Sequence, residues 1–188
     1  MDLDVVAPRL SAGGVIPDGE DWWFEHPARD HHLANATTTW VVPFTPAGDT
    51  VAVNMSSGRH HIPVGTIEPG ENWQDGAERE LWEELGAQVL EIRPFGAIVT
   101  SRKVRLATWA EITDPTGPEE PDRSGNYVEA LVRGEVAAIV ALLERDDQGV
   151  LADLYRVADR LRVRGFLPID VDDSFFAPLE GDEVAEWE

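Results

Sequence analysis

The 188-residue sequence predicts an α/β fold, an α/β/α sandwich in which a mixed β-sheet lies between helices. Two observations support this prediction. Stretches rich in β-branched and aromatic residues alternate with turn residues over residues 37–112. Helical apolar spacing occurs at residues 72–86 and again at residues 135–163. A chain of this length can bury one sizeable core. We therefore expect a single domain over residues 36–170, with residues 171–188 as an acidic tail.

The first 35 residues form an N-terminal extension or arm in this interpretation. Glycines and a proline interrupt any regular element there: Gly13, Gly14, Pro17 and Gly19. Residues 21–27 concentrate aromatic surface, which either packs across the domain or a partner subunit or lines a pocket for a base or leaving group; packing is the favoured alternative. Two histidine pairs, 31–32 and 60–61, have no third ligand at helical spacing, and we expect them at the surface or in loops.

The strands and helices follow in a definite order. A predicted hairpin joins the first two strands through the turn at residues 46–49, and residues 114–125 form a loop with three prolines. The expected strands are residues 37–45, 50–55, 60–64, 88–100, 104–112 and 126–132, and the expected late helices are residues 135–144 and 150–163.

One helix has both of its ends marked in the sequence. Asn72 can accept hydrogen bonds from the free N–H groups of the first turn, and Asp75 adds a negative charge there. Gly86 suits the left-handed conformation that ends a helix. The apolar stripe that would pack on the sheet consists of Ala77, Leu81 and Leu85.

A second face of this helix gathers acidic side chains. Glu80, Glu83 and Glu84 are spaced i, i+3, i+4 and therefore repel one another. Arg79 is expected to compensate only one of them, best Glu83 at i+4. Either the face is fully hydrated, as charge runs usually are, or it binds a hard divalent cation such as Mg²⁺ or Mn²⁺, which prefers clustered oxygen ligands.

The full spacing decides between these alternatives. Gly65 is followed after five residues by Glu71, after seven more by Arg79-Glu80-Leu81, and then by Glu83-Glu84 and Gly86. This pattern resembles the Nudix box, with every fixed position present from Gly65 to Ala87. The resemblance covers 23 residues directly and, through the strand pattern, extends loosely over residues 37–145. We call residues 65–87 the box segment.

The resemblance implies a Nudix-like fold and a pyrophosphohydrolase. Members of this family hydrolyse nucleoside diphosphates linked to another moiety, with Mg²⁺ or Mn²⁺ as cofactor. By resemblance, the metal ligands are Glu80, Glu83, Glu84 and the carbonyl of Val64; Glu84 also counts among the catalytic residues. Arg79 would hold the carboxylates in place with the support of Glu71, while Gly65 and Gly70 would allow the tight loop to approach substrate.

Residues outside the box segment are less constrained. A further acid commonly serves as ligand or base, and Glu129 is the first candidate, followed by Glu119 and Glu120. Arg102 and Tyr127 are candidate substrate-binding residues. Several indoles could also stack a base, although each is more commonly a core residue: Trp22, Trp23, Trp40 and Trp109. Subgroup motifs for ADP-ribose, diadenosine polyphosphates, NADH and coenzyme A are absent, so a small nucleotide, either a nucleoside triphosphate or a nucleotide-sugar, is the default substrate.

Composition excludes other classes. The chain has 36 acidic and 15 basic residues, a formal charge of −21, and shows no basic footprint for a long nucleic acid. It has no cysteine, hence no disulfide framework, zinc–thiolate site or thiol nucleophile. The N-terminus has no signal-peptide pattern and no apolar run approaches ~20 residues. We expect a soluble, cytoplasmic protein that does not bind membranes, with a homodimer left open.

Two further hypotheses come from other functional classes. A Nudix-like ligand-binding or sensor module without catalysis would be expected to have lost carboxylates, and here all are retained. An isomerase of the isopentenyl diphosphate type is disfavoured because that family's isomerases use a cysteine, which this chain lacks.

Overall fold

The computed structural model describes residues 1–16, 19–118 and 127–163. The predicted tail at 171–188 and the candidates Glu119 and Glu120 lie outside these residues. The elements are α1 (Leu3–Val6), α2 (Pro8–Ala12), β1 (Gly14–Val15), β2 (Asp21–Glu25), α3 (Asp30–Asn35), β3 (Ala36–Phe44), β4 (Thr50–Met55), β5 (His60–His61), β6 (Val64–Thr66), α4 (Trp73–Leu85), β7 (Val89–Thr100), β8 (Val104–Ile112), β9 (Val128–Gly134), α5 (Val136–Arg145) and α6 (Gly149–Val163).

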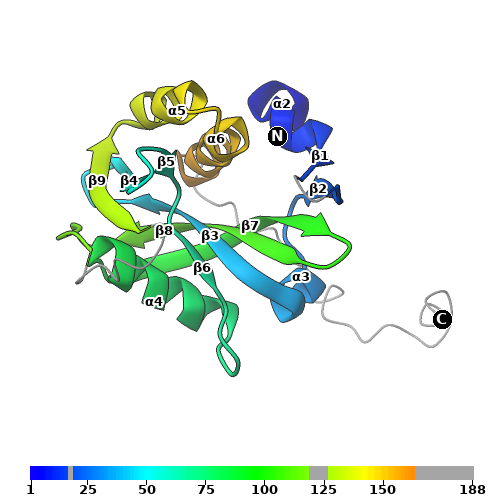
Figure 1. Ribbon diagram of the computed structural model, residues 1–188, viewed down its shortest axis with the longest axis horizontal. Helices are drawn as coiled ribbons and strands as arrows, with labels where there is room; N and C mark the ends of the chain where they lie inside the picture. The colour runs from blue at the N-terminus through cyan, green and yellow to red at the C-terminus, as the bar shows by residue number, and fades with distance from the viewer. Residues whose placement is uncertain (17–18, 119–126, 164–188) are drawn as a thin grey trace, which may run out of the picture.

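All strands in the described part of the chain join one mixed sheet, as the sequence predicts. The main order is β1-β2-β7-β8-β3-β4-β5, with β6 on β3 and β9 on β4. The pair β3–β8 is parallel, and every other pair is antiparallel. Helix α4 lies on one side of the sheet, and α5, α6 and the N-terminal helices α1 and α2 lie on the other (Figure 1). The α/β/α sandwich is therefore confirmed.

Alternation along the strands builds two separate cores. Val41 belongs to the apolar cluster between the sheet and α4, whereas its neighbour Val42 belongs to the larger cluster under α5 and α6. Successive side chains of a strand point to opposite faces, so β3 contributes to both cores. Tyr155 of α6 is fully buried in the larger core, where its hydroxyl donates to the Val51 carbonyl at 2.6 Å.

The predicted hairpin of β3 and β4 is much shorter than expected. Only Phe44 and Thr50 pair directly, because the first half of β3 pairs with β6 on that side, from Thr38↔Thr66 to Trp40↔Val64. Strand β4 instead pairs along its length with β9. The predicted strand at residues 60–64 is divided into β5 and β6 for the same reason: its two ends pair with different neighbours.

The N-terminal segment is part of the sheet. Strand β2 pairs with β7 from Trp22↔Thr100 to Glu25↔Ala97. Helix α2 is held against α6 by Asp153, whose Oδ2 accepts from the backbone N–H groups of Arg9 (2.8 Å) and Leu10 (3.2 Å). None of the helices described is both long enough and apolar enough to span a membrane.

Candidate functional site

Helix α4 places the acidic residues of the box segment. The Asn72 side chain accepts from the N–H groups of Gln74 and Asp75, and Gly86 adopts the left-handed conformation at φ 62°, ψ 34°. Both predicted ends are thus confirmed. The apolar stripe Ala77, Leu81 and Leu85 is fully buried against the sheet, which turns the glutamates of the helix away from that core.

Arg79 connects the loop and the helix. Its Nε and Nη2 donate to the two oxygens of Glu71 at 2.9 and 3.2 Å, and its Nη1 donates to Glu80 at 2.7 Å. Glu83 is farther away, at 3.4 Å, and Nη2 also donates to the Thr66 carbonyl at 2.9 Å. The expectation that Arg79 compensates only one glutamate of the helix, best Glu83, is wrong. The planar guanidinium offers five N–H donors, so it pairs with Glu80 as well as Glu83, and the loop brings Glu71 within its reach.

Gly65 has a specific steric role. A Cβ built on it would lie 1.7 Å from Cγ and 2.2 Å from Oε1 of Glu80. No side chain larger than hydrogen leaves room for the Glu80 carboxylate in this position. Gly70 differs, since a Cβ there meets no atom within 4 Å, but its φ of +95° favours glycine. The first glycine makes space for a carboxylate, and the second shapes the turn.

Glu84 is the most buried carboxylate of the group. Its Oε2 accepts from the backbone N–H of Val64 at 3.2 Å. Burial, reinforced by the charges of Glu80 and Glu83, raises the pKa of Glu84 to about 8. Burial also raises the pKa of Glu80, whereas the Arg79 hydrogen bond lowers the pKa of Glu71. Glu84 therefore lacks the positive partner that Glu71 has.

The donor set fits a hard divalent cation. Three carboxylates, those of Glu71, Glu80 and Glu83, contact a single guanidinium. Glu84, which has the highest pKa of the group, has no cationic partner in the part of the chain that the structure describes. All ligand atoms on offer are oxygens, which suit Mg²⁺ or Mn²⁺. In the described part of the chain no three of these carboxylates bring ligand oxygens within 4.8 Å of one another, so a cation bound there would have to draw their side chains together.

The structure brings together the box residues but not the other candidates. Glu129 is exposed on β9, and Arg102 is exposed in the turn between β7 and β8. Tyr127 precedes β9, and its backbone N–H donates to Ser56 Oγ at 3.3 Å. In the described ranges none of the three forms a hydrogen bond or ion pair with the box segment, so their roles stay predictions, as does that of the Val64 carbonyl.

A second polar cluster contains Glu25, His31 and His32, whose ligand-type atoms lie within 4.8 Å of one another. The third member, Glu25, lies at the end of strand β2 and not on α3, which is why helical spacing does not reveal it. His32 is buried, and its Nδ1 accepts from the backbone N–H of Arg29 at 3.0 Å. The neutral ring therefore carries its proton on Nε2, 3.1 Å from the Glu25 carboxylate. Because that nitrogen has no lone pair to give, the cluster is better suited to joining β2 and α3 than to binding a metal.

Two cavities lie on the face of the sheet away from α4. The first, which we call the sheet pocket, has a volume of about 380 Å³ and is lined by Val15, Ile16, Trp22, Trp40, His61, Ile98, Arg105, Gln148, Val150 and Leu151. Trp22 and Trp40, two of the predicted base-stacking candidates, line it. Trp109 is buried in the core. The position of Arg105 in this pocket could not be predicted from the sequence, since it depends on the register of β8.

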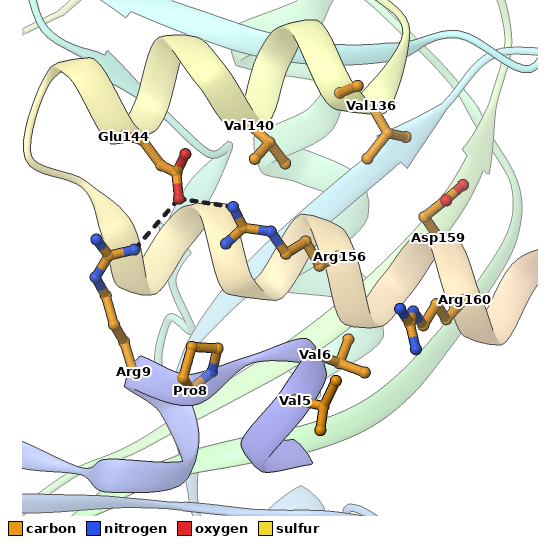
Figure 2. Close-up of a pocket in the computed structure, with 11 residues that line it drawn as sticks. Val5, Val6, Pro8, Arg9, Val136, Val140, Glu144, Arg156, Asp159 and Arg160 are labelled. Carbon is orange, nitrogen blue, oxygen red and sulfur yellow. Dashed lines mark hydrogen bonds and ion pairs between the residues drawn. The ribbon is translucent and has the colours of Figure 1, made fainter. Parts of the chain in front are cut away.

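The second cavity, which we call the helix cavity, has a volume of about 880 Å³ and lies between the N-terminal helices, α5 and α6 (Figure 2). Valines of α1 and α5 line it. Its arginines Arg9 and Arg156 converge on Glu144, at 3.5 and 2.6 Å. The cavity is larger than the sheet pocket, but none of the residues that line it lies on β3 or β6, the strands that lead to the box segment.

Comparisons with known proteins identify a family for the chain. The family model of the NUDIX domain matches residues 35–156. Among solved structures, the chain is similar to a Bacillus subtilis pyrophosphohydrolase, BsRppH, with a TM-score of 0.52 and 16% identity over 65% of this chain and 76% of that one. It is also similar to a C. elegans Ap4A hydrolase, with a TM-score of 0.49 and 14% identity over 68% of this chain and 98% of that one.

Proposed function

Because the chain belongs to the NUDIX family, we propose that it is a metal-dependent hydrolase that cleaves the pyrophosphate bond of a nucleoside diphosphate linked to another moiety. The observation that carries this proposal is the charge imbalance at α4: three carboxylates share Arg79, and the fourth, Glu84, has no cationic partner among the described residues. The Bacillus subtilis protein of similar fold is named a pyrophosphohydrolase, which supports the same reaction class.

The residues of the chain have distinct tasks in this proposal. Glu80, Glu83 and Glu84 would hold Mg²⁺ or Mn²⁺, with Val64 beside them. When bound, the cation would supply positive charge for the pyrophosphate oxygens and increase the acidity of a water molecule that attacks phosphorus. Arg79 orients Glu71 and Glu80 through its fork of hydrogen bonds. Gly65 leaves the space that Glu80 occupies.

The test is product release from a panel of nucleoside triphosphates, nucleotide-sugars and dinucleotides with Mg²⁺ or Mn²⁺. We expect metal-dependent turnover that falls by ~10² or more in Glu84→Gln, as is typical when a metal ligand is removed. Glu78→Gln is the matched control, because Glu78 is exposed on the same helix and keeps full turnover.

Two outcomes would overturn the proposal. Turnover that persists in Glu84→Gln would remove the assignment of the site. Cation binding by calorimetry without turnover on any substrate would instead favour the ligand-binding module.

A further inference from the structure

The sheet pocket lies beside the box segment along the sheet. Trp40, one of its walls, pairs in register with Val64, and the Val64 N–H donates to Glu84. Paired residues on adjacent strands are separated by about 5 Å. The end of the pocket formed by Trp40 is thus one strand away from the backbone group that binds Glu84. The helix cavity has no such connection.

The shape and lining suit a flat aromatic ligand. Trp22 stands on β2 and Trp40 on β3, and strands β7 and β8 lie between them. The register also offsets the two residues along the strands, so their backbones are roughly 19 Å apart and the indoles form opposite ends of the pocket. The floor between them includes Ile98, and α6 contributes Val150 and Leu151 above. Aromatic side chains that stack on a base contribute ~1–3 kcal/mol per base, and a volume of about 380 Å³ is in the usual range of small-molecule sites.

Arg105 is a free cation in this pocket. Within the described residues its side chain has no hydrogen bond and no ion pair, whereas Arg79, Arg133 and Arg156 each bind two or more carboxylates. In a chain with 36 acidic residues, an arginine without a carboxylate partner is available to a ligand. A guanidinium offers only donors, arranged as a fork that binds two neighbouring acceptors.

His61 provides the complementary group. Its Nδ1 lies 2.8 Å from the Ile62 carbonyl and must carry a proton to donate there. Burial lowers the pKa of His61 and keeps the ring neutral, so Nε2 has a lone pair and can accept a hydrogen bond. The pocket thus contains a donor-only fork, Arg105, and an acceptor, His61. Gln148 also lines it, but an amide both donates and accepts and therefore suits either purine.

We propose that the sheet pocket receives the nucleobase of the substrate and that Arg105 selects guanine over adenine. Guanine presents two neighbouring acceptors, O6 and N7, to an arginine fork, and its N1–H and 2-amino donors can reach an acceptor such as His61 Nε2. Adenine places its N6 donor beside N7 and repels the fork. The proposal names the base for the hydrolase proposed above and rests on that function; it also makes Trp22 of the N-terminal segment a substrate-binding residue.

The test measures binding without hydrolysis. Calorimetry of the metal-free protein with GMP, IMP and AMP should give GMP the highest affinity, ~10-fold or more above AMP. IMP should be intermediate, because it keeps O6 and N7 but has no 2-amino group for His61. Arg105→Met should bring GMP and AMP within about twofold, and Arg105→Lys, which keeps the charge but not the fork, should lose most of the preference. Arg160→Met, at the helix cavity, is the matched control and keeps it.

The outcomes separate this proposal from the hydrolase proposal. Equal or tighter binding of AMP, or a GMP preference that survives both Arg105 variants, overturns the base assignment alone. A GMP preference that depends on Arg105 in a protein that hydrolyses no substrate overturns the hydrolase and leaves the pocket assignment standing. A Glu84→Gln protein should retain the GMP preference, since Glu84 does not line the pocket.

Discussion

Arg79 and Arg156 each gather carboxylates from different parts of the chain, but the two networks differ in charge balance. Arg156 binds Asp153 and Glu144, both at 2.6 Å, and Glu144 also meets Arg9, so two carboxylates face two guanidinium groups. Arg79 contacts three carboxylates, and in the described ranges none of its ion-pair partners meets a second cation. The balanced network needs nothing further and holds helices together. The network around Arg79 leaves negative charge over, which the proposed cation would offset; this surplus is what we would expect of a cation-binding site and not of a structural ion-pair network.

The first way to sharpen this comparison is to break the balanced network at its buried member. Asp153 is fully buried and accepts from two backbone N–H groups of α2 and from Arg156. Asp153→Ala leaves these donors without a partner, so we expect a loss of about 3–5 kcal/mol in the free energy of unfolding, measured by urea denaturation. Turnover per folded molecule should change little.

The control for this prediction lies on the same helix. Asp159 meets Arg162 at 3.9 Å and is about a third exposed, so Asp159→Ala should cost less than ~1 kcal/mol. Equal losses of unfolding free energy in the two variants would contradict the prediction, because they would show that the buried Asp153 stabilises the fold no more than the partly exposed Asp159 does.

The second prediction disturbs the unbalanced network without touching a charge. Gly65→Ala places a methyl group where Glu80 now packs, and the carboxylate must move. We expect the affinity for Mn²⁺, measured by calorimetry, to fall by ~10–100-fold, the usual effect of displacing groups around a metal site. Gly70→Ala is the comparison, since it strains the backbone at φ +95° but meets no atom; it should lower stability more than affinity. Unchanged Mn²⁺ binding in Gly65→Ala would count against Glu80 as a ligand.

The contrast also explains what could be predicted from the sequence. The box segment is contiguous, so the Asn72 cap, the apolar stripe and the glutamate face follow from helical spacing alone. Asp153 and Arg105 owe their roles to partners or walls supplied by remote segments, and neither stands in a local pattern. Asp153 lies 143 residues from Leu10, whose N–H it binds.

Strand register accounts for the remaining differences. The parallel pairing of β3 with β8 and the pairing of β3 with β6 set where Trp40 lies, and no local rule fixes either. The predicted hairpin was overestimated for the same reason, because adjacency in sequence favours β4 as the partner of β3 until the competing pairing with β6 is known.

The last prediction concerns pH and separates the two networks most finely. In the metal-free protein the pKa of Glu84 is raised to about 8 from an ordinary value of 4.5. The folded state therefore holds this proton more tightly than the unfolded chain does. The resulting stabilisation is fully present below pH 4.5 and is lost as the pH rises through about 8. Between pH 6 and pH 9 the free energy of unfolding of the wild type, in EDTA, should fall by about 3 kcal/mol relative to Glu84→Gln, whose amide does not titrate. Glu78→Gln should follow the wild type.

Added Mg²⁺ should stabilise the wild type more at pH 9 than at pH 6, because its binding requires Glu84 without its proton. Parallel stability curves for wild type and Glu84→Gln would mean that Glu84 does not carry the uncompensated charge of the Arg79 network.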